Sequence, residues 1–294
     1  MDERNIIMTK SLFISILGRT NAGKSTLLNR LCGEKIAIVT PKPQTTRTSI
    51  MGVLTKGDTQ FVFVDTPGLH NAKTKLGENM LKSAGKSLDG ADLVLAVADA
   101  TKHKFDFPAT GDVPAILVLN KIDKSTPAEI AEKIAAYTSK RDWTAVVPIS
   151  ALTGDGVFEL FAEAAKFAYE APHLFPDDAL TDQPVRVMAA EIIREKLLFA
   201  LREEIPHGVA VLITKMEEGD KLTTIFADIY CEREGHKKMI IGKGGTVIKQ
   251  VGTLAREELE RFLDTKVNLQ TFVKIKDGWR ENERYIKEFG LSER

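Results

Sequence analysis

The first half of the chain alternates short apolar runs with longer amphipathic stretches. The apolar runs, rich in β-branched residues, predict strands at 11–17, 49–55, 60–64, 92–98, 114–119 and 144–149. The stretches between them predict helices at 24–31, 73–87, 127–138 and 156–169. The run DLVLAVA at 92–98 is apolar after its first residue, which is typical of a strand buried on both faces. This alternation predicts an α/β domain with a doubly wound, mostly parallel sheet.

A different order of elements follows. Residues 171–184 contain three prolines and several acidic residues without periodicity, which predicts a linker. Beyond it the pattern predicts a helix at 185–203, strands at 207–216 and 222–231, a glycine-rich turn at 242–245, a helix to about 263 and a strand at 266–275. We therefore expect a first domain at 1–172, a linker at 173–184 and a smaller α+β domain at 185–294.

Composition fits two ordinary globular domains. The chain has 294 residues, of which 43% are apolar and 28% are charged, so a disordered chain or a fibre is excluded. Lys and Arg together number 41, and Asp and Glu together also number 41, so the formal net charge is zero. This balance excludes nucleic-acid binding through bulk positive charge. A local patch stays open, because residues 235–256 hold five basic residues and no acidic one.

Cysteine content and the N-terminal pattern predict a cytoplasmic protein. Cys32 and Cys231 are the two cysteines, and a pair so far apart indicates a reducing compartment without a disulfide or metal framework. We expect both to be small core residues. The apolar stretch from Leu12 to Leu17 is too short for a signal peptide or a membrane span.

The segment Gly18–Ser25 fits the phosphate-loop pattern G-x-x-x-x-G-K-[ST], directly after a predicted strand and at the start of a helix. Its glycines let backbone N–H groups surround phosphate oxygens, and the start of the helix adds positive potential. Lys24 supplies a cation for the β- and γ-phosphates, and the Ser25 hydroxyl can bind Mg²⁺. The predicted nucleotide-binding residues here are Asn21, Ala22, Gly23, Lys24, Ser25 and Thr26.

Three further motifs end predicted strands. In Asp65-Thr66-Pro67-Gly68, the carboxylate can hold Mg²⁺ through water, and the Gly68 N–H can meet a γ-phosphate. In the sequence NKID at 120–123, Asp123 can accept hydrogen bonds from two guanine donors that adenine lacks. The predicted base-side residues are Asn120 (a tie to the phosphate loop), Lys121 (a cover for the base), Asp123, Ser150 and Ala151, whose N–H would meet the guanine carbonyl oxygen.

The four motifs GRTNAGKS, DTPG, NKID and ISA, in this order, resemble the translation-factor-related class of P-loop GTPases. The segment PQTTR at 43–47 is similar to the first switch of that class, whose threonine closes on Mg²⁺ and the γ-phosphate. By this resemblance the role belongs to Thr46, with Thr45 as the alternative. The resemblance implies GTP and GDP as ligands, Mg²⁺ as cofactor bound by Ser25, Thr46 and Asp65, and Lys24, Thr46 and Gly68 as catalytic residues.

The segment from Met239 to Lys249, MIIGKGGTVIK, resembles the KH motif I-G-x-x-G-x-x-I-K, and the order of elements around it is similar to the second KH type. In such domains the GxxG turn joins two helices and clamps single-stranded nucleic acid. The predicted RNA-binding residues are Lys237, Lys238, Ile241, Gly242, Lys243, Gly244, Gly245 and Lys249. We expect backbone clamping to dominate, with Phe272 and Trp279 as packing residues.

A P-loop GTPase domain followed by a KH domain resembles the Era family of GTPases over essentially the whole chain. The resemblance implies that the protein binds the 3′ end of the small-subunit ribosomal RNA and assists assembly of the small ribosomal subunit. Leu69 stands where Ras-like enzymes carry the glutamine that orients water, so a low intrinsic rate of hydrolysis is expected. The family also implies a K⁺ site at Asn21, and the alternative is that Asn21 only braces the loop.

Two other functions stay open from the sequence. One is an RNA-binding assembly module in which the nucleotide site is structural, and the other is a GTPase that docks a protein partner through its KH-like domain. We expect a monomer. Peripheral association with the inner face of the cell membrane stays open, although the helix predicted at 185–203 carries three acidic residues besides its four basic ones.

Overall fold

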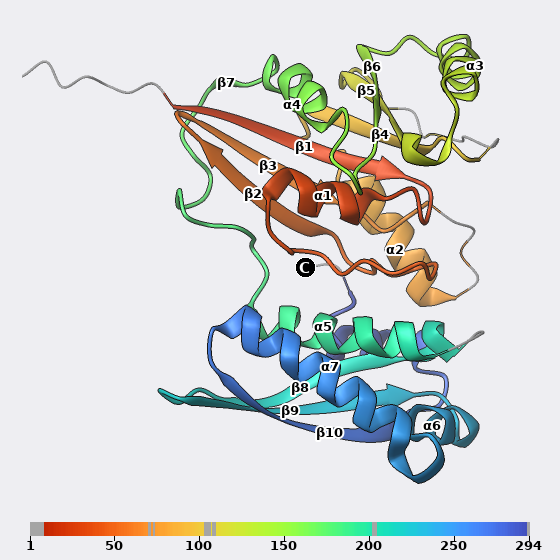
Figure 1. The fold of residues 1–294 in the computed structure, drawn as a ribbon, viewed down its shortest axis with the longest axis vertical. Coiled ribbons are helices and arrows are strands. Elements are labelled where there is room, and N and C mark those ends of the chain that lie inside the picture. The colour runs from red at the N-terminus through yellow and green to blue at the C-terminus, as the bar shows by residue number, and fades with distance from the viewer. Residues whose placement is uncertain are drawn as a thin grey trace, which may run out of the picture. The chain divides into compact units, whose positions relative to one another are not determined.

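The structure of the protein is a computed structural model that describes residues 9–69, 72, 74–102, 107, 110–201 and 205–292. The chain forms two compact units (Figure 1). Unit 1 consists of Met1–Ala37, Thr46–Asn71 and Met80–Asp182, and unit 2 consists of Ile38–Thr45, Ala72–Asn79 and Gln183–Arg294. Two short segments from the first half of the sequence, 38–45 and 72–79, therefore belong to the unit that contains the second half.

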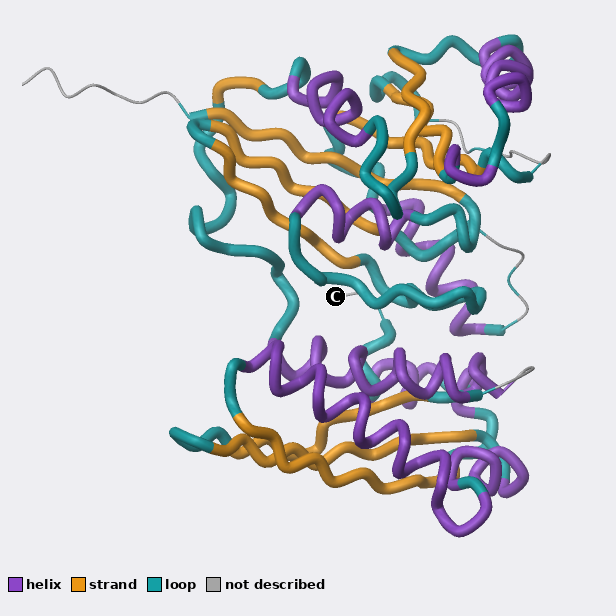
Figure 2. The backbone as a smooth tube through the Cα atoms, in the orientation of Figure 1, coloured by secondary structure: helices purple, strands orange, loops and turns teal. Residues whose placement is uncertain are grey.

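Unit 1 contains a seven-stranded sheet in the order β2-β3-β1-β4-β5-β6, with β7 paired to β1 (Figure 2). The strands are β1 (Lys10–Gly18), β2 (Ile50–Lys56), β3 (Thr59–Asp65), β4 (Leu93–Asp99), β5 (Ala115–Asn120), β6 (Ala145–Ile149) and β7 (Tyr169–Glu170). Strands β3, β1, β4, β5 and β6 are parallel, while β2 and β7 are antiparallel to their partners. The predicted mostly parallel sheet is confirmed.

Helices cover both faces of this sheet, as the fully apolar strands predict. They are α1 (Lys24–Cys32), α2 (Lys75–Lys86), α3 (Pro127–Thr138) and α4 (Val157–Ala165). Leu28 of α1 and Leu160 of α4 pack against Ile14 in one core cluster. On the other face Tyr137 of α3 packs against Leu117 and its neighbours. Every residue of β4 except its last is buried.

Unit 2 is a three-stranded sheet covered by helices. The elements are α5 (Val185–Ala200), β8 (Ala210–Glu217), β9 (Leu222–Cys231), α6 (Glu234–Ile241), α7 (Thr246–Leu263), β10 (Lys266–Ile275) and α8 (Glu283–Glu288). The order is β10-β9-β8, with β9 parallel to β10 and antiparallel to β8. Helices α5 and α7 lie side by side over one face (Figure 1), where Ile193 and Val251 pack against Ile229.

The segment after β10 packs around a buried tryptophan. The Trp279 side chain is fully buried, and its Nε1 donates to the carbonyl oxygen of Gly208 at 3.0 Å. Phe289 stacks on Tyr230 with ring centroids 4.6 Å apart. The prediction for Trp279 is confirmed, but the one for Phe272 is wrong. Phe272 is 49% exposed, because it pairs with Asp228, which alternates along β9 with the residues that face the α5–α7 core.

Some element boundaries differ from the sequence prediction. The helix predicted to reach residue 169 ends at Ala165, because the chain then pairs with the start of β1. The helix predicted to reach residue 203 is helical to Ala200, and residues 202–204 lie outside the described part of the chain. Both cysteines are free and buried, as predicted. Among the described residues, none of the helices has the length and apolar character needed to cross a membrane.

The predicted linker follows the edge of the unit 1 sheet. The buried side chain of Gln60 accepts hydrogen bonds from the N–H groups of Leu174 and Phe175 at 2.8 and 2.9 Å, and donates to the Phe175 carbonyl. Farther on, the N–H of Val53 donates to the Leu180 carbonyl at 2.8 Å. These bonds dock the segment against β2 and β3, so residues 171–181 do not behave as a free connector.

His173 fastens the start of this segment. Its Nδ1 lies 2.6 Å from Asp177 Oδ1, and its Nε2 donates to the Asp58 carbonyl at 3.0 Å. The hydrogen bond to the Asp177 carboxylate and the bond to Asp58 raise the pKa of His173 above its ordinary value of 6.5.

We predict that docking of residues 171–181 weakens at alkaline pH. Because the pKa of His173 is raised in the docked state, its contribution is complete below pH 6.5 and is lost as the pH rises through the docked-state pKa. Amide hydrogen exchange at Leu174 and Phe175, corrected for intrinsic rates, measures the free energy of local opening. The difference between wild type and His173→Gln should shrink as the pH rises, whereas Asp178→Asn should behave as wild type. A difference that is constant from pH 5.5 to 8.5 would contradict the prediction.

Candidate functional site

The carboxyl ends of four parallel strands bring the sequence motifs together. The phosphate loop follows β1, the segment 65–68 closes β3, the segment 120–123 follows β5, and residues 150–151 follow β6. These strands are neighbours or near neighbours in the sheet, and the carboxyl ends of parallel strands meet at one edge. The candidate site is therefore assembled by the sheet rather than by any one motif.

The phosphate loop depends on a glycine with a left-handed backbone. Gly23 has φ 94° and immediately precedes α1. A Cβ on Gly23 would stand 2.3 Å from Asn120 Nδ2, so a larger residue would push the two motifs apart. Asn21 is also left-handed, with φ 61°, and Thr26 lies half-buried in the first turn of α1. This backbone is the glycine-dependent turn that the sequence predicts.

Lys24 lies inside the loop. Its side chain is buried, and Nζ donates to the carbonyl oxygens of Gly18 and Arg19 at 3.1 and 3.2 Å. Burial lowers the pKa of the Lys24 ammonium, and the Asp65 carboxylate partly opposes this. An anion beside the ammonium would restore its charge, since a nearby negative charge favours the protonated form.

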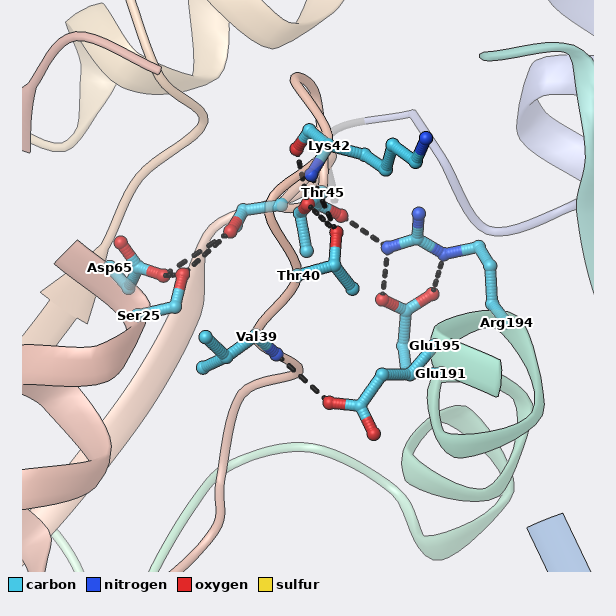
Figure 3. A network of polar contacts seen from close by, with 10 residues as sticks. Ser25, Val39, Thr40, Lys42, Thr45, Asp65, Glu191, Arg194 and Glu195 are labelled. Atoms are coloured by element: carbon cyan, nitrogen blue, oxygen red, sulfur yellow. Dashed lines mark hydrogen bonds and ion pairs between the residues drawn. The ribbon is translucent and has the colours of Figure 1, made fainter. Parts of the chain in front are cut away.

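A cluster of hydroxyl and carboxylate oxygens forms around Ser25 and Asp65 (Figure 3). Ser25 Oγ donates to Asp65 Oδ2 at 2.6 Å and lies 2.9 Å from Thr46 Oγ1. Thr46 Oγ1 reaches the same carboxylate oxygen at 3.4 Å. The other oxygen, Asp65 Oδ1, is buried and has no hydrogen-bond partner among the described residues, and burial raises the pKa of this carboxyl despite Lys24.

These oxygens fit a divalent cation. Mg²⁺ prefers hard oxygen ligands, and the buried Asp65 carboxylate keeps one oxygen without a hydrogen bond from the described part of the chain. A cation would offset the burial that raises the pKa of Asp65. Within the described residues no cluster of three or more His, Cys, Asp or Glu side chains could hold a metal. A resident ion here would therefore need oxygens from a bound ligand or water as well.

The DTPG segment lies directly against the phosphate loop. A Cβ on Gly68 would be 2.6 Å from Thr20 Cα, so only glycine fits this approach without displacement of the loop. The N–H of Leu69 donates to the Gly18 carbonyl at 3.0 Å. The structure thus places Gly68 where its backbone borders the phosphate loop, and it places Leu69 with an apolar side chain beside it.

Asn120 ties three segments together. Its side chain is buried, and Nδ2 donates to the Ala22 carbonyl at 2.8 Å, which is the tie that the sequence predicts. Oδ1 accepts hydrogen bonds from the N–H groups of Lys121 and Ala151, at 2.8 and 3.0 Å. One carboxamide therefore fixes the phosphate loop, the NKID segment and the ISA segment relative to one another.

Two of the other predicted base-side residues, Asp123 and Ser150, hydrogen-bond to each other. Ser150 Oγ donates to Asp123 Oδ1 at 2.8 Å, so the serine orients the carboxylate that we expect to read guanine. The Ala151 N–H, which the sequence predicts will meet a guanine carbonyl oxygen, donates in the structure to Asn120 Oδ1, because the ends of β5 and β6 are adjacent in the sheet.

Sequence reasoning missed Asp99, the last residue of β4. Lys121 Nζ donates to Asp99 Oδ2 at 2.7 Å and to the Asn21 carbonyl at 2.6 Å, which links the base-side lysine to the phosphate loop. Partial burial alone would raise the pKa of Asp99, but hydrogen bonds from Lys121 and Thr101 lower it overall. The signal was present, because Asp99 ends a strand at the same edge of the sheet as the motifs.

The glycine-rich turn of unit 2 joins α6 to α7. Gly242, Gly244 and Gly245 have φ 76°, 62° and 79°, which L side chains rarely adopt. A Cβ on Gly242 would be 2.6 Å from Val247 Cγ2, whereas the space beside Gly244 and Gly245 is open. Of the predicted RNA-binding side chains, those of Lys238, Lys243 and Lys249 are exposed, and those of Lys237 and Ile241 are half-buried.

Comparison with known proteins covers both units. The family model described as 50S ribosome-binding GTPase matches residues 13–121, and the KH domain model matches residues 204–280. GTPase Era of Ruminiclostridium cellulolyticum is 44% identical over 293 residues, which is 96% of this chain and 97% of the relative. GTPase Era of Clostridioides difficile is 46% identical over 297 residues, which is 98% of this chain and 100% of the relative.

A solved structure shares the same architecture. The crystal structure of Era in complex with MgGDPNP and nucleotides 1506–1542 of 16S ribosomal RNA matches with a TM-score of 0.93 and 39% identity, over 97% of this chain and 100% of that one. The match extends over both units, and the strand-end motifs and the GKGG turn lie in the elements where the sequence predicts them. The chain therefore belongs to the Era family of GTPases.

Proposed function

We propose that the protein binds and hydrolyses GTP, binds the 3′ end of the small-subunit ribosomal RNA, and assists assembly of the small ribosomal subunit. The observation that carries this proposal is the convergence of a phosphate loop, an oxygen cluster and a guanine-type base motif at one sheet edge, in a chain whose other unit bears an exposed GKGG turn. A relative of the same architecture was crystallised with MgGDPNP and a 16S ribosomal RNA fragment, which supports both ligands.

The phosphate loop and the oxygen cluster would hold Mg·GTP. Backbone groups of residues 21–26 would surround the phosphates, and Lys24 would neutralise their charge. Ser25 and Thr46 would bind Mg²⁺ directly and Asp65 through water, and the bound ion supplies positive charge against the β- and γ-phosphates. Gly68 would offer its N–H to the γ-phosphate.

Hydrolysis by this site alone should be slow. Leu69 carries no group that could orient the attacking water, so the water must be held by backbone groups, by the segment around Thr46 or by a bound partner. The catalytic contribution of Lys24, Thr46 and Gly68 is then electrostatic, because phosphoryl transfer needs little covalent chemistry from the protein. His70 lies outside the described residues, and the proposal gives it no role.

We predict that Asp123→Asn changes the base that the protein accepts. The Asp123 carboxylate would accept hydrogen bonds from guanine N1–H and its amine, and an amide at this position cannot accept both. Affinity for GDP should fall by about 100-fold, and affinity for xanthosine diphosphate, which replaces the amine by a carbonyl, should rise. Fluorescent-nucleotide titration measures both. The exposed variant Asp112→Asn should leave them unchanged, and an equal loss for both bases would contradict the role.

We further propose that Asn21 is a ligand of K⁺ at the phosphates. Asn21 is exposed and left-handed, and its carbonyl accepts a hydrogen bond from Lys121, so the residue lies on the accessible side of the loop that would meet the phosphates. A cation there would supply charge that an arginine finger gives in other GTPases. We expect faster GTP turnover in K⁺ than in Na⁺ at equal ionic strength, and no difference in Asn21→Ala. Equal wild-type rates in the two salts would leave Asn21 as a brace of the loop.

The GKGG turn would clamp single-stranded RNA. Its glycines bring backbone N–H groups close to phosphates, and the turn lies in a segment with basic and no acidic residues. Fluorescence anisotropy of an oligonucleotide copying the RNA 3′ end tests this, with protein loaded with a non-hydrolysable GTP analogue and then with GDP. Binding should be tighter in the GTP form, salt-sensitive, and about tenfold weaker in Lys243→Ala with Lys249→Ala than in the Lys221→Ala control.

The outcomes of this titration separate the alternatives. Equal binding in both nucleotide states would favour an RNA-binding module whose nucleotide site is structural. No binding in either state would favour a GTPase that docks a protein through its KH-like unit.

The remaining features of the proposal concern the chain as a whole. We propose a cytoplasmic monomer with a GTP-binding domain at 1–172, a connecting segment at 173–184 and an RNA-binding domain at 185–294. Peripheral contact with the inner face of the cell membrane is the alternative location. Co-sedimentation with anionic vesicles would test the membrane contact, and sedimentation equilibrium would test the monomeric state.

A further inference from the structure

Helix α5 carries two buried charged side chains on neighbouring residues. Arg194 is 2% exposed and Glu195 is 3% exposed, although this helix otherwise buries apolar residues such as Ile193 and Leu197. A buried charge is costly unless it is paired and hydrogen-bonded, so apolar residues would serve a purely structural helix better. The partners of these two side chains therefore indicate what they do.

Both side chains hold the segment 38–45, which belongs to the same unit (Figure 3). The Arg194 guanidinium forms a two-point ion pair with Glu191, through Nε at 2.7 Å and Nη2 at 2.5 Å, and Nη2 also donates to the carbonyl oxygen of Thr45. Glu195 Oε1 accepts the N–H of Val39 at 3.0 Å. One turn of the helix thus contacts the backbone near both ends of the segment.

Hydrogen bonds within the segment fold it into a loop. Thr45 Oγ1 donates to the Lys42 carbonyl at 2.7 Å and lies 2.7 Å from Thr40 Oγ1. Gln44 adopts φ 58°, an unusual conformation for a residue other than glycine. The segment is therefore a compact loop that would move as one piece if its end contacts changed.

In the chain, this loop is followed directly by a residue of the oxygen cluster. Thr45 is the last residue of the segment, and Thr46, whose Oγ1 contacts Ser25 and Asp65, follows it in the chain. The peptide group is planar, so a hydrogen bond to the Thr45 carbonyl also fixes the direction of the Thr46 N–H. Arg194 therefore hydrogen-bonds the peptide group that joins Thr45 to Thr46.

A further pair extends the network to α7. Glu195 Oε2 accepts Lys196 Nζ at 2.7 Å, and Lys196 also pairs with Glu258 of α7. Partial burial alone would lower the pKa of Lys196, but the hydrogen bonds that its ammonium donates to Glu195 and Glu258 raise it overall. Helix α7 begins directly after the GKGG turn, so the contacts of the loop continue to the helix that starts at the proposed RNA site.

We propose that Arg194 and Glu195 are positioning residues that set the conformation of residues 39–45 and thereby the approach of Thr46 to the γ-phosphate and its cation. This inference rests on the proposed function, because it assigns a role to residues outside the nucleotide motifs in that same reaction. The GTP-bound state should depend on these two side chains more than the GDP-bound state, since only GTP presents a γ-phosphate to Thr46.

The test compares nucleotide affinities of variants on the one helix. In Arg194→Met the side-chain volume is kept and the hydrogen bonds are lost, while Arg186→Met removes an exposed arginine of the same helix as a matched control. We expect Arg194→Met to weaken binding of a non-hydrolysable GTP analogue by about tenfold and to slow single-turnover hydrolysis, with GDP affinity within about twofold of wild type. Arg186→Met should match wild type in all three measurements.

Glu195 gives a second comparison that keeps the proposal falsifiable if Arg194→Met folds poorly. Glu195→Gln retains an oxygen that can accept the Val39 N–H and should preserve the preference for the GTP analogue, whereas Glu195→Ala should lose it. Equal losses for GDP and the GTP analogue, or no loss in either Arg194→Met or Glu195→Ala, would overturn the inference. Failure of the wild-type protein to bind either nucleotide would instead overturn the proposed function. The titration of wild type by itself distinguishes this outcome.

Discussion

The candidate site depends on one buried carboxamide, that of Asn120. Its three hydrogen bonds reach the phosphate loop, its own following peptide and the end of the neighbouring strand β6. Each such bond stabilises the fold by only about 1 kcal/mol, but loss of the side chain would leave buried backbone groups unsatisfied. The contact is so tight that Gly23 has no room for a Cβ beside it. The phosphate side and the base side of the site are therefore held in a single arrangement.

Burial disfavours the charged forms of Lys24 and Asp65 in this site, and a bound nucleotide with its cation would offset that effect. Burial lowers the pKa of Lys24 and raises that of Asp65, so both lose part of their preference for the charged form. A phosphate favours the ammonium and a divalent cation favours the carboxylate. The site is thus complementary to an anion and a cation together, which is the charge pattern of Mg·GTP.

Helix α5 joins the core of unit 2 to the loop at 38–45 of the same unit. The apolar residues of this helix build the unit 2 core, and Arg194 and Glu195 hold the loop that ends at Thr46. Helix α7 packs beside α5 and starts at the GKGG turn. The same short stretch of helix therefore contacts both the loop that precedes Thr46 and the helix that starts at the GKGG turn.

Much of the fold and of the site could be predicted because the relevant signals are local. The phosphate loop is a pattern within eight consecutive residues, in which backbone geometry requires the glycines and phosphate and Mg²⁺ binding require Lys24 and Ser25. The carboxyl ends of parallel strands meet at one edge of the sheet whatever the loops between them do. The same holds for the GKGG turn, whose glycines permit the positive φ values that it adopts.

Contacts between residues distant in the chain could not be predicted this way. Arg194 and Thr45 are 149 positions apart, and nothing in the local sequence of either identifies the other. The docking of the linker on Gln60, the Asp99–Lys121 pair and the exposure of Phe272 likewise follow from which strands are neighbours and which face is covered. The sequence alone determined the motifs, the order of elements and the family. The tertiary structure decided which charged side chains are buried together, because desolvation and pairing depend on neighbours that only the folded chain supplies.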